Sequence, residues 1–206
     1  MELKKFIKSQ RLPLAMIKKK GIPPQVFVQA QQKIMYWFFA FPSKQFGINE
    51  LSQRLNISKT TTTTIVQQLC QEKFLNVEEI GRLWRISANI THPYMLTRKV
   101  PFHLSHIYES GILEAIHKQI PQTKAVILFG SYRKGDDTEQ SDIDIAIEVV
   151  SDDEPKQIHL GNLEQLGYRT NVPVNVHVFS RNKIPLNLFA NIANGIVLEG
   201  FLEVRP

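Results

Sequence analysis

Residues 128–135 read LFGSYRKG, and residues 141–144 read SDID. The unbroken apolar run at 125–129 predicts a buried strand leading into the first stretch. Gly130 then lets the backbone turn sharply, and Ser131 can cap a short helix whose first N–H groups favour an anion. Two basic side chains follow in the same turn. The turn is therefore predicted to hold phosphate groups, through Gly130, Ser131, Arg133 and Lys134.

The second stretch opens a segment, Asp142–Glu148, in which polar and apolar residues alternate strictly. Side chains on a strand point to opposite faces with a period of two, so the three isoleucines enter a core and Asp142 and Asp144 share the other face. Two carboxylates this close repel each other unless a cation lies between them. Mg²⁺ is commonly bound by one or two carboxylates together with substrate phosphates. We therefore expect Asp142 and Asp144 to be catalytic residues that bind Mg²⁺, which would activate an attacking oxygen and stabilise a leaving pyrophosphate.

This order of glycine–serine turn, basic residues and Asp142-Ile143-Asp144 resembles the signature of the nucleotidyltransferase superfamily, which includes DNA polymerase beta and the minimal nucleotidyltransferases. Each half alone would be interpreted as an ordinary turn or a solvated strand edge, but their order between two apolar strands favours the functional interpretation. The resemblance implies binding of a nucleoside triphosphate, with ATP the first candidate, and transfer of its NMP group to an acceptor. Acceptors in the family include small antibiotics, tRNA ends and protein side chains. Relatives of the minimal type act as antitoxins that nucleotidylate a toxin, which makes a protein partner an expectation as well.

The family normally carries a third Asp on a later strand. The matching segment is Val172–Phe179, where Asn175 and His177 share the outward face and Asn175 takes the position of the Asp. An amide oxygen can contact a metal but carries no charge and cannot take a proton. His177 can accept a proton near neutral pH, although an ordinary solvent-facing strand residue is the interpretation we prefer. The sequence therefore supports nucleotide and metal binding more strongly than turnover.

The composition is that of a globular protein, with 43% hydrophobic and 21% charged residues in a chain of 206. No apolar run approaches the ~18 residues of a membrane span. The N-terminus lacks a secretory apolar core, and the single Cys70 excludes an internal disulfide, so we expect a cytoplasmic protein without membrane contact. The net charge is uneven: residues 1–98 carry 15 Lys/Arg and five Asp/Glu, while residues 99–206 carry ten and 14. This asymmetry predicts two modules, of which the basic one is the candidate for binding a polyanion.

The basic half reads as three helices and a hairpin. The predicted elements are a helix at 26–41, a short amphipathic helix at 48–55, a helix at 59–74 capped by Ser58, and strands at 75–80 and 83–87 around Gly81-Arg82. The order resembles, over roughly residues 25–95, the winged helix-turn-helix of bacterial and archaeal transcriptional regulators. In that motif the second helix reads the major groove of DNA.

The helix at 59–74 carries a polar stripe opposite its apolar face. Thr and Gln side chains can reach base edges and phosphates, while Lys59 and Arg82 would contact the DNA backbone. Such stripes are usually only solvated, winged helices also serve protein contacts or dimerisation, and RNA is the competing polyanion. The expected residues for binding double-stranded DNA are Lys59, Thr60, Thr63, Thr64, Gln67 and Arg82.

The expected fold class is α+β, in three parts: a basic arm at 1–24, a winged helix-turn-helix domain at 25–95, and a nucleotidyltransferase-like α/β domain with a small mixed sheet at 96–206. Further helices are predicted at about 103–119, from 151–155 onward and at 183–194, and a closing strand at 195–200. His103 and His106 are expected to be ordinary surface or interdomain residues. Two functions stay open: a Mg²⁺-dependent nucleotidyltransferase with a DNA-binding winged helix, and a catalytically weak nucleotide sensor acting as a transcriptional regulator or antitoxin. A homodimer is a further expectation, because winged-helix regulators are often dimers.

Overall fold

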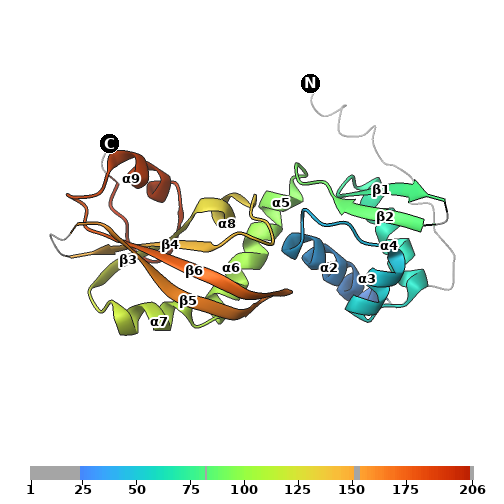
Figure 1. Cartoon of the computed structure of the whole chain (residues 1–206), viewed down its shortest axis with the longest axis horizontal. Coiled ribbons are helices and arrows are strands. Elements are labelled where there is room, and N and C mark those ends of the chain that lie inside the picture. The colour runs from blue at the N-terminus through green and yellow to red at the C-terminus, as the bar shows by residue number, and fades with distance from the viewer. Residues whose placement is uncertain (1–23, 82, 151–153, 205–206) are drawn as a thin grey trace, which may run out of the picture.

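The computed structural model describes residues 24–81, 83–150 and 154–204. The predicted basic arm lies outside these residues except for its last position, and so does Arg82. Along the long axis of the molecule, helices and a hairpin lie at one end and a five-stranded sheet at the other (Figure 1). The mixed α+β class is confirmed, with the small mixed sheet in the C-terminal half.

The N-terminal half follows the predicted order of elements. They are α2 (Pro24–Ala40), α3 (Ile48–Leu55), α4 (Lys59–Gln71), β1 (Leu75–Ile80) and β2 (Leu83–Ala88). In the turn between α3 and α4, Asn56 adopts the left-handed region with φ 51°. Ser58 is the N-cap of α4, as predicted, and its hydroxyl accepts a hydrogen bond from the N–H of Thr61. β1 and β2 form an antiparallel hairpin. Side chains from all three helices and the hairpin share one apolar core, which includes Phe38, Leu51, Leu69 and Ile86.

The threonine run occupies the first turns of α4 without needing an outside partner. The hydroxyls of Thr62, Thr63 and Thr64 each donate to the backbone carbonyl four residues earlier, at 2.9–3.0 Å. Such bonds satisfy the side chain inside its own helix. The run is therefore compatible with a helix on local grounds, and its oxygens can still accept hydrogen bonds from outside.

The sheet has the strand order β5-β6-β4-β3-β7. Its strands are β3 (Thr123–Phe129), β4 (Ile143–Val149), β5 (Lys156–Leu166), β6 (Arg169–Phe179) and β7 (Ile196–Gly200). β4 and β6 run parallel and all other neighbours run antiparallel, which makes the sheet mixed. The isoleucines of β4 and the alternate valines of β6 are buried, as the period-two pattern predicts.

Among the described residues, α5 (Tyr94–Thr97) packs on the N-terminal core and is followed by α6 (Lys99–Glu109), α7 (Ile112–Gln119), α8 (Gly130–Lys134) and α9 (Leu186–Ala193). α9 lies on one side of the sheet and α7 on the other (Figure 1). α6 spans the two halves, because its Phe102 belongs to the N-terminal core and its Ile107 to the core beneath the sheet. In the described part of the chain, no helix combines the length and apolar character needed to cross a membrane.

Two predicted helices are wrong. The helix expected at 103–119 is divided at Ser110-Gly111, where Gly111 adopts φ 80° and ends the regular backbone. The helix expected to begin at 151–155 is absent from the described residues there, and the chain forms β5 instead, which pairs antiparallel with β6. The acidic residues before Pro155 resemble a helix start, but Ile158 and Leu160 alternate with polar residues at a strand period.

Candidate functional site

The glycine–serine turn and the acidic pair converge. Antiparallel pairing of β3 and β4 places Phe129 opposite Asp144, and the chain turns at Gly130 with φ 71°. A Cβ added to Gly130 would lie only 2.7 Å from Oδ2 of Asp144. Asp142 lies two residues earlier, and both carboxylates are half-buried. The turn predicted to hold phosphates is thus in direct contact with Asp144, one of the two carboxylates predicted to bind the metal.

β6 brings two more predicted side chains to the same face. Asn175 is the parallel partner of Asp144, and its Nδ2 donates to Oδ2 of Asp142 at 3.0 Å. Nε2 of His177 lies 4.0 Å from Oδ1 of Asp144, with the imidazole packed edge-on against Phe129 at 5.2 Å. The structure therefore assembles Asp142, Asp144, Asn175 and His177 beside the glycine turn.

Burial shifts the titration of two of these groups. Burial raises the pKa of Asp144 and the charge of Asp142 adds to the rise, while His177 opposes it. Burial lowers the pKa of His177, against the opposing charge of Asp144. The lowered pKa favours the neutral imidazole, which has a nitrogen able to accept a proton.

The donor set fits Mg²⁺ that arrives with a nucleotide. Within the described residues no three His, Cys, Asp or Glu side chains are grouped to hold a metal ion. Asp142 and Asp144 supply two hard carboxylates, and Gly130, which has no Cβ, lies directly against that of Asp144. Because Mg²⁺ is often held by one or two carboxylates plus substrate phosphates, these two side chains suffice only if a triphosphate completes the coordination.

The remaining predicted phosphate-binding residues lie on α8. Ser131 and Arg133 are half-buried and Lys134 is exposed. The two basic residues occupy the last turn of this short helix, which ends at Gly135 with φ 78°. Ser131 therefore adjoins the glycine at the start of α8, and the positive charges lie at its other end.

Sequence reasoning missed a second group of side chains behind the site. Lys99, His103, Tyr132, Asp137 and Arg169 are all buried and contact one another. The expectation that His103 lies at the surface is wrong, because the side chain is 1% exposed and its Nε2 lies 3.1 Å from Oδ2 of the buried Asp137. His159 on β5 was also missed, since that segment was predicted as helix. Its Nδ1 lies 3.4 Å from Oδ1 of Asn175.

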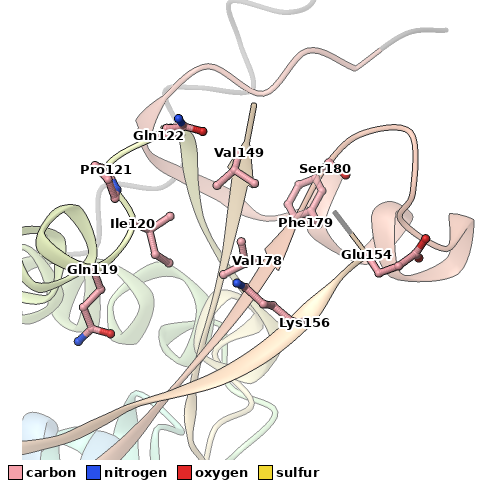
Figure 2. A pocket seen from close by; sticks show the side chains of 10 residues that line it. All are labelled: Gln119, Ile120, Pro121, Gln122, Val149, Glu154, Lys156, Val178, Phe179 and Ser180. Atoms are coloured by element: carbon pink, nitrogen blue, oxygen red, sulfur yellow. The ribbon is translucent and has the colours of Figure 1, made fainter. Parts of the chain in front are cut away.

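A separate cavity of about 230 Å³ lies at the other end of β4 and β6 (Figure 2). Val149, Val178 and Phe179 give it apolar walls, and the segment joining α7 to β3 closes one side. None of the side chains around the acidic pair lines it. The cavity is therefore distinct from the candidate nucleotide site.

The surface predicted to bind DNA is exposed on α4. Lys59, Thr60, Thr64 and Gln67 are exposed, and Thr63 is half-buried. Lys59 and Thr63 also line a surface groove of about 410 Å³, between the start of α3 and β2. The predicted contact at Arg82 lies outside the described residues.

Comparison with protein families gives a match in the C-terminal half of the chain. No curated protein matches the chain significantly. Residues 110–197, which are 88 of the 206, match the family model of the nucleotidyltransferase domain. The matched region contains the glycine–serine turn, both carboxylates and the positions of Asn175 and His177. The C-terminal half of this chain thus carries a region that matches the nucleotidyltransferase domain family, which supports its place in the nucleotidyltransferase superfamily.

Proposed function

We propose that the protein is a Mg²⁺-dependent nucleotidyltransferase that binds a nucleoside triphosphate, ATP first among the candidates, and transfers the NMP group to an acceptor. The observation that carries this proposal is the direct approach of Gly130 to Asp144. A side chain at position 130 would collide with the Asp144 carboxylate, so the glycine lets the turn proposed to bind phosphate lie directly against the proposed metal ligand. The family match supports the same chemistry.

In this proposal each group has a defined task. The backbone at Gly130 and the hydroxyl of Ser131 lie along the triphosphate, and Arg133 and Lys134 balance its charge. Asp142 and Asp144 would hold Mg²⁺, which would stabilise the negative charge on the attacking and leaving oxygens. The acceptor oxygen bonds to the α-phosphorus, the bond to the β-phosphate bridge breaks, and pyrophosphate leaves.

The acceptor proton needs a base, and Asn175 cannot supply one. His177 lies 4.0 Å from Asp144 and burial lowers its pKa, so it is a side chain on this face able to take that proton. Its 4.0 Å separation from the carboxylate leaves its nitrogen uncommitted to a short hydrogen bond with Asp144. The proposal thus assigns His177 the role that the third carboxylate plays in the family.

Label transfer from α-labelled nucleotide tests the proposal. Purified protein, Mg²⁺ and α-labelled ATP are incubated with a cell extract, and the labelled macromolecule is identified. We expect transfer by the wild type and none by Asp142→Ala/Asp144→Ala. The matched control is Glu114→Ala/Glu164→Ala, which removes two exposed carboxylates from the same half and should leave transfer unchanged. Transfer that persists in the Asp142/Asp144 variant would refute the catalytic assignment.

The hydrogen bond from Asn175 to Asp142 favours an alternative at the same site. An amide in place of a third carboxylate keeps the position occupied while removing its charge. A protein of this kind can bind Mg²⁺ and nucleotide with little turnover and act as a nucleotide-sensing regulator or antitoxin. Nucleotide binding without any label transfer is the outcome that supports this alternative.

For the N-terminal half we propose a winged helix that binds double-stranded DNA. The order α2-α3-α4-β1-β2, the exposed polar face of α4 and the excess of basic residues support this assignment. Duplex binding measured by fluorescence anisotropy should weaken steeply with added salt. Thr60→Ala/Thr64→Ala/Gln67→Ala should reduce affinity, whereas Thr91→Ala/Thr97→Ala/Gln119→Ala, which also removes exposed hydroxyls and an amide, should not. Equal affinity of the two triple variants for the duplex would contradict the proposal that α4 binds in the DNA groove. Tighter binding of duplex RNA than of duplex DNA would indicate that RNA is the ligand.

A further inference from the structure

The loop of residues 135–141 joins the two parts of the candidate site, because it begins where α8 ends and finishes at Asp142. We call it the connecting loop. Its start packs closely on α5, since a Cβ added to Gly135 would lie 2.1 Å from the carbonyl oxygen of Met95. Its end is a closed turn in which Ser141 N–H donates to the Thr138 carbonyl and the Ser141 hydroxyl accepts the Thr138 N–H. The path of this loop sets the separation between the glycine–serine turn and Asp142.

A buried lysine holds the first part of the connecting loop. Nζ of Lys99, on α6, donates to the carbonyl oxygens of Asp137 at 2.5 Å and Gly135 at 3.3 Å. The same ammonium lies 3.0 Å from Oδ1 of Asp137, and its side chain is 1% exposed. Lys99 therefore directs its ammonium group at three oxygens of one short segment.

A buried arginine holds the other end. Nη2 of Arg169 donates to the carbonyl oxygen of Ser141 at 2.8 Å, directly before Asp142. Nη1 of the same guanidinium donates to the hydroxyl of Tyr132, which is fully buried in α8. One rigid side chain thus ties the residue next to the metal-binding carboxylate to the helix that begins at Gly130.

Asp137 supplies the counter-charge. Its carboxylate is 0% exposed and lies between Nζ of Lys99 at 3.0 Å and Nε2 of His103 at 3.1 Å. Burial opposes its ionisation, but His103 and Lys99 outweigh that effect and hold the pKa of Asp137 below its ordinary value. Taking charges out of water costs several kcal/mol per ion, so a buried ion pair is weak evidence for stability. A loop that served only as a connection would gain more from apolar contacts.

We propose that Lys99 and Arg169 are positioning residues, which fix the connecting loop so that Asp142 stays aligned with the glycine–serine turn and thereby set the affinity for Mg²⁺–nucleotide. The proposal rests on the nucleotide site proposed above. Lys99 lies outside the region that matches the nucleotidyltransferase family, on a helix whose Phe102 stacks on Tyr36 in the N-terminal core at 4.2 Å. The alignment of the site is therefore supplied in part by a helix anchored in the other half of the chain.

The test separates alignment from stability. Lys99→Met leaves the Asp137 charge buried alone and should lower both melting temperature and affinity. Lys99→Met/Asp137→Asn removes both charges, so the melting temperature should return toward the wild-type value. The connecting loop still lacks the hydrogen bonds from Lys99 in this double variant. Its affinity for Mg²⁺ with a non-hydrolysable ATP analogue, measured by calorimetry, should therefore remain about tenfold or more below that of the wild type. Arg169→Met should weaken binding in the same way.

Glu148→Gln is the matched control. Glu148 is a buried carboxylate at the far end of β4, 3.4 Å from Nζ of Lys124 and 3.5 Å from Nε of Arg181. Its replacement should lower the melting temperature and leave affinity within about twofold, a change too small to reflect a displaced ligand. Hydrogen exchange should rise across residues 135–144 in Lys99→Met/Asp137→Asn and stay unchanged there in the control.

The binding measurements distinguish a failure of the positioning role from a failure of the nucleotide site. If the wild type binds the Mg²⁺–analogue complex and Lys99→Met/Asp137→Asn binds it equally well, the positioning role is wrong while the proposed function stands. Unchanged exchange in the connecting loop has the same meaning. If the wild type itself does not bind the complex, the nucleotide site is wrong and the positioning inference falls with it.

Discussion

Replacement of Gly130 by alanine introduces two separate perturbations. The residue has φ 71°, a region that residues with a Cβ rarely adopt. The new Cβ would also lie 2.7 Å from Oδ2 of Asp144, about 0.7 Å less than the 3.4 Å at which ordinary contact begins. The carboxylate or the turn must therefore move by several tenths of an ångström, and this movement falls on the group proposed to bind the metal.

The two perturbations have different magnitudes and different consequences. The left-handed backbone costs about 1–2 kcal/mol for a residue with a Cβ. For a unit of about 100 residues, each kcal/mol lowers the melting temperature by roughly 4–8 °C. Displacement of a reacting group by about 1 Å can reduce turnover by about 100-fold. We therefore expect Gly130→Ala to lose about 1–2 kcal/mol of stability and at least about tenfold in nucleotide transfer.

Gly111→Ala isolates the backbone effect. Gly111 has φ 80°, and a Cβ there would meet nothing closer than 3.9 Å. Both variants should lose similar stability in thermal or denaturant unfolding, because they share the left-handed backbone. Only Gly130→Ala should weaken label transfer and binding of the Mg²⁺–analogue complex. Nucleotide affinity that is equal in the two variants would show that the space beside Asp144 is not a ligand site.

Two further predictions concern the charge of the site and of the buried cluster. Asn175→Asp places a third carboxylate beside Asp142, so without metal it should lower stability by about 1–2 kcal/mol. Added Mg²⁺ should restore that stability. The control Asn162→Asp, on the neighbouring strand, should show no Mg²⁺ dependence in thermal unfolding. A metal-independent loss in Asn175→Asp contradicts the metal site. Burial lowers the pKa of His103 in the folded state. As the pH falls, the histidine of the unfolded chain therefore binds its proton before the buried one does. The stability that neutral His103 provides is present above pH 6.5 and is lost as the pH falls below that value. Denaturant unfolding should therefore weaken in the wild type by up to about 1.4 kcal/mol per pH unit relative to His103→Gln, and parallel profiles for the two proteins would show that buried His103 is protonated. The groups that face His103 are Asp137, Lys99, Arg169 and Tyr132.

Local patterns in the sequence were enough to predict the strands that carry Asp142, Asp144 and Asn175 and the sharp turn at Gly130. The expected cap at Ser131 is wrong, because Phe129 is the N-cap of α8 and no side chain caps this helix. The alternation in 142–148 follows from the geometry of one strand, so it predicts which side chains share a face. The family resemblance placed Asn175 next to the acidic pair, and the parallel pairing of β4 and β6 confirms that placement. The N-cap at Ser58 was predicted correctly.

Contacts between distant parts of the chain could not be predicted in this way. Lys99 and Asp137 are 38 residues apart, and the buried position of Lys99 depends on how α6 packs against the connecting loop. Because lysine side chains ordinarily lie at the surface, the residue type alone predicts an exposed Lys99. The error at β5 has a similar origin, because an acidic segment before Pro155 is compatible with a helix start, and pairing with β6 decides the outcome.

The central claim is that Asp142, Asp144 and the turn at Gly130 bind one nucleotide together with one divalent ion. Its most direct test is a calorimetric titration of a non-hydrolysable ATP analogue into the wild type and into Asp142→Asn/Asp144→Asn, each with Mg²⁺ and with chelator. Saturable binding by the wild type in Mg²⁺, lost with chelator and lost in the double variant, is the result we expect. Binding that survives both treatments, or no binding by the wild type, would contradict the claim.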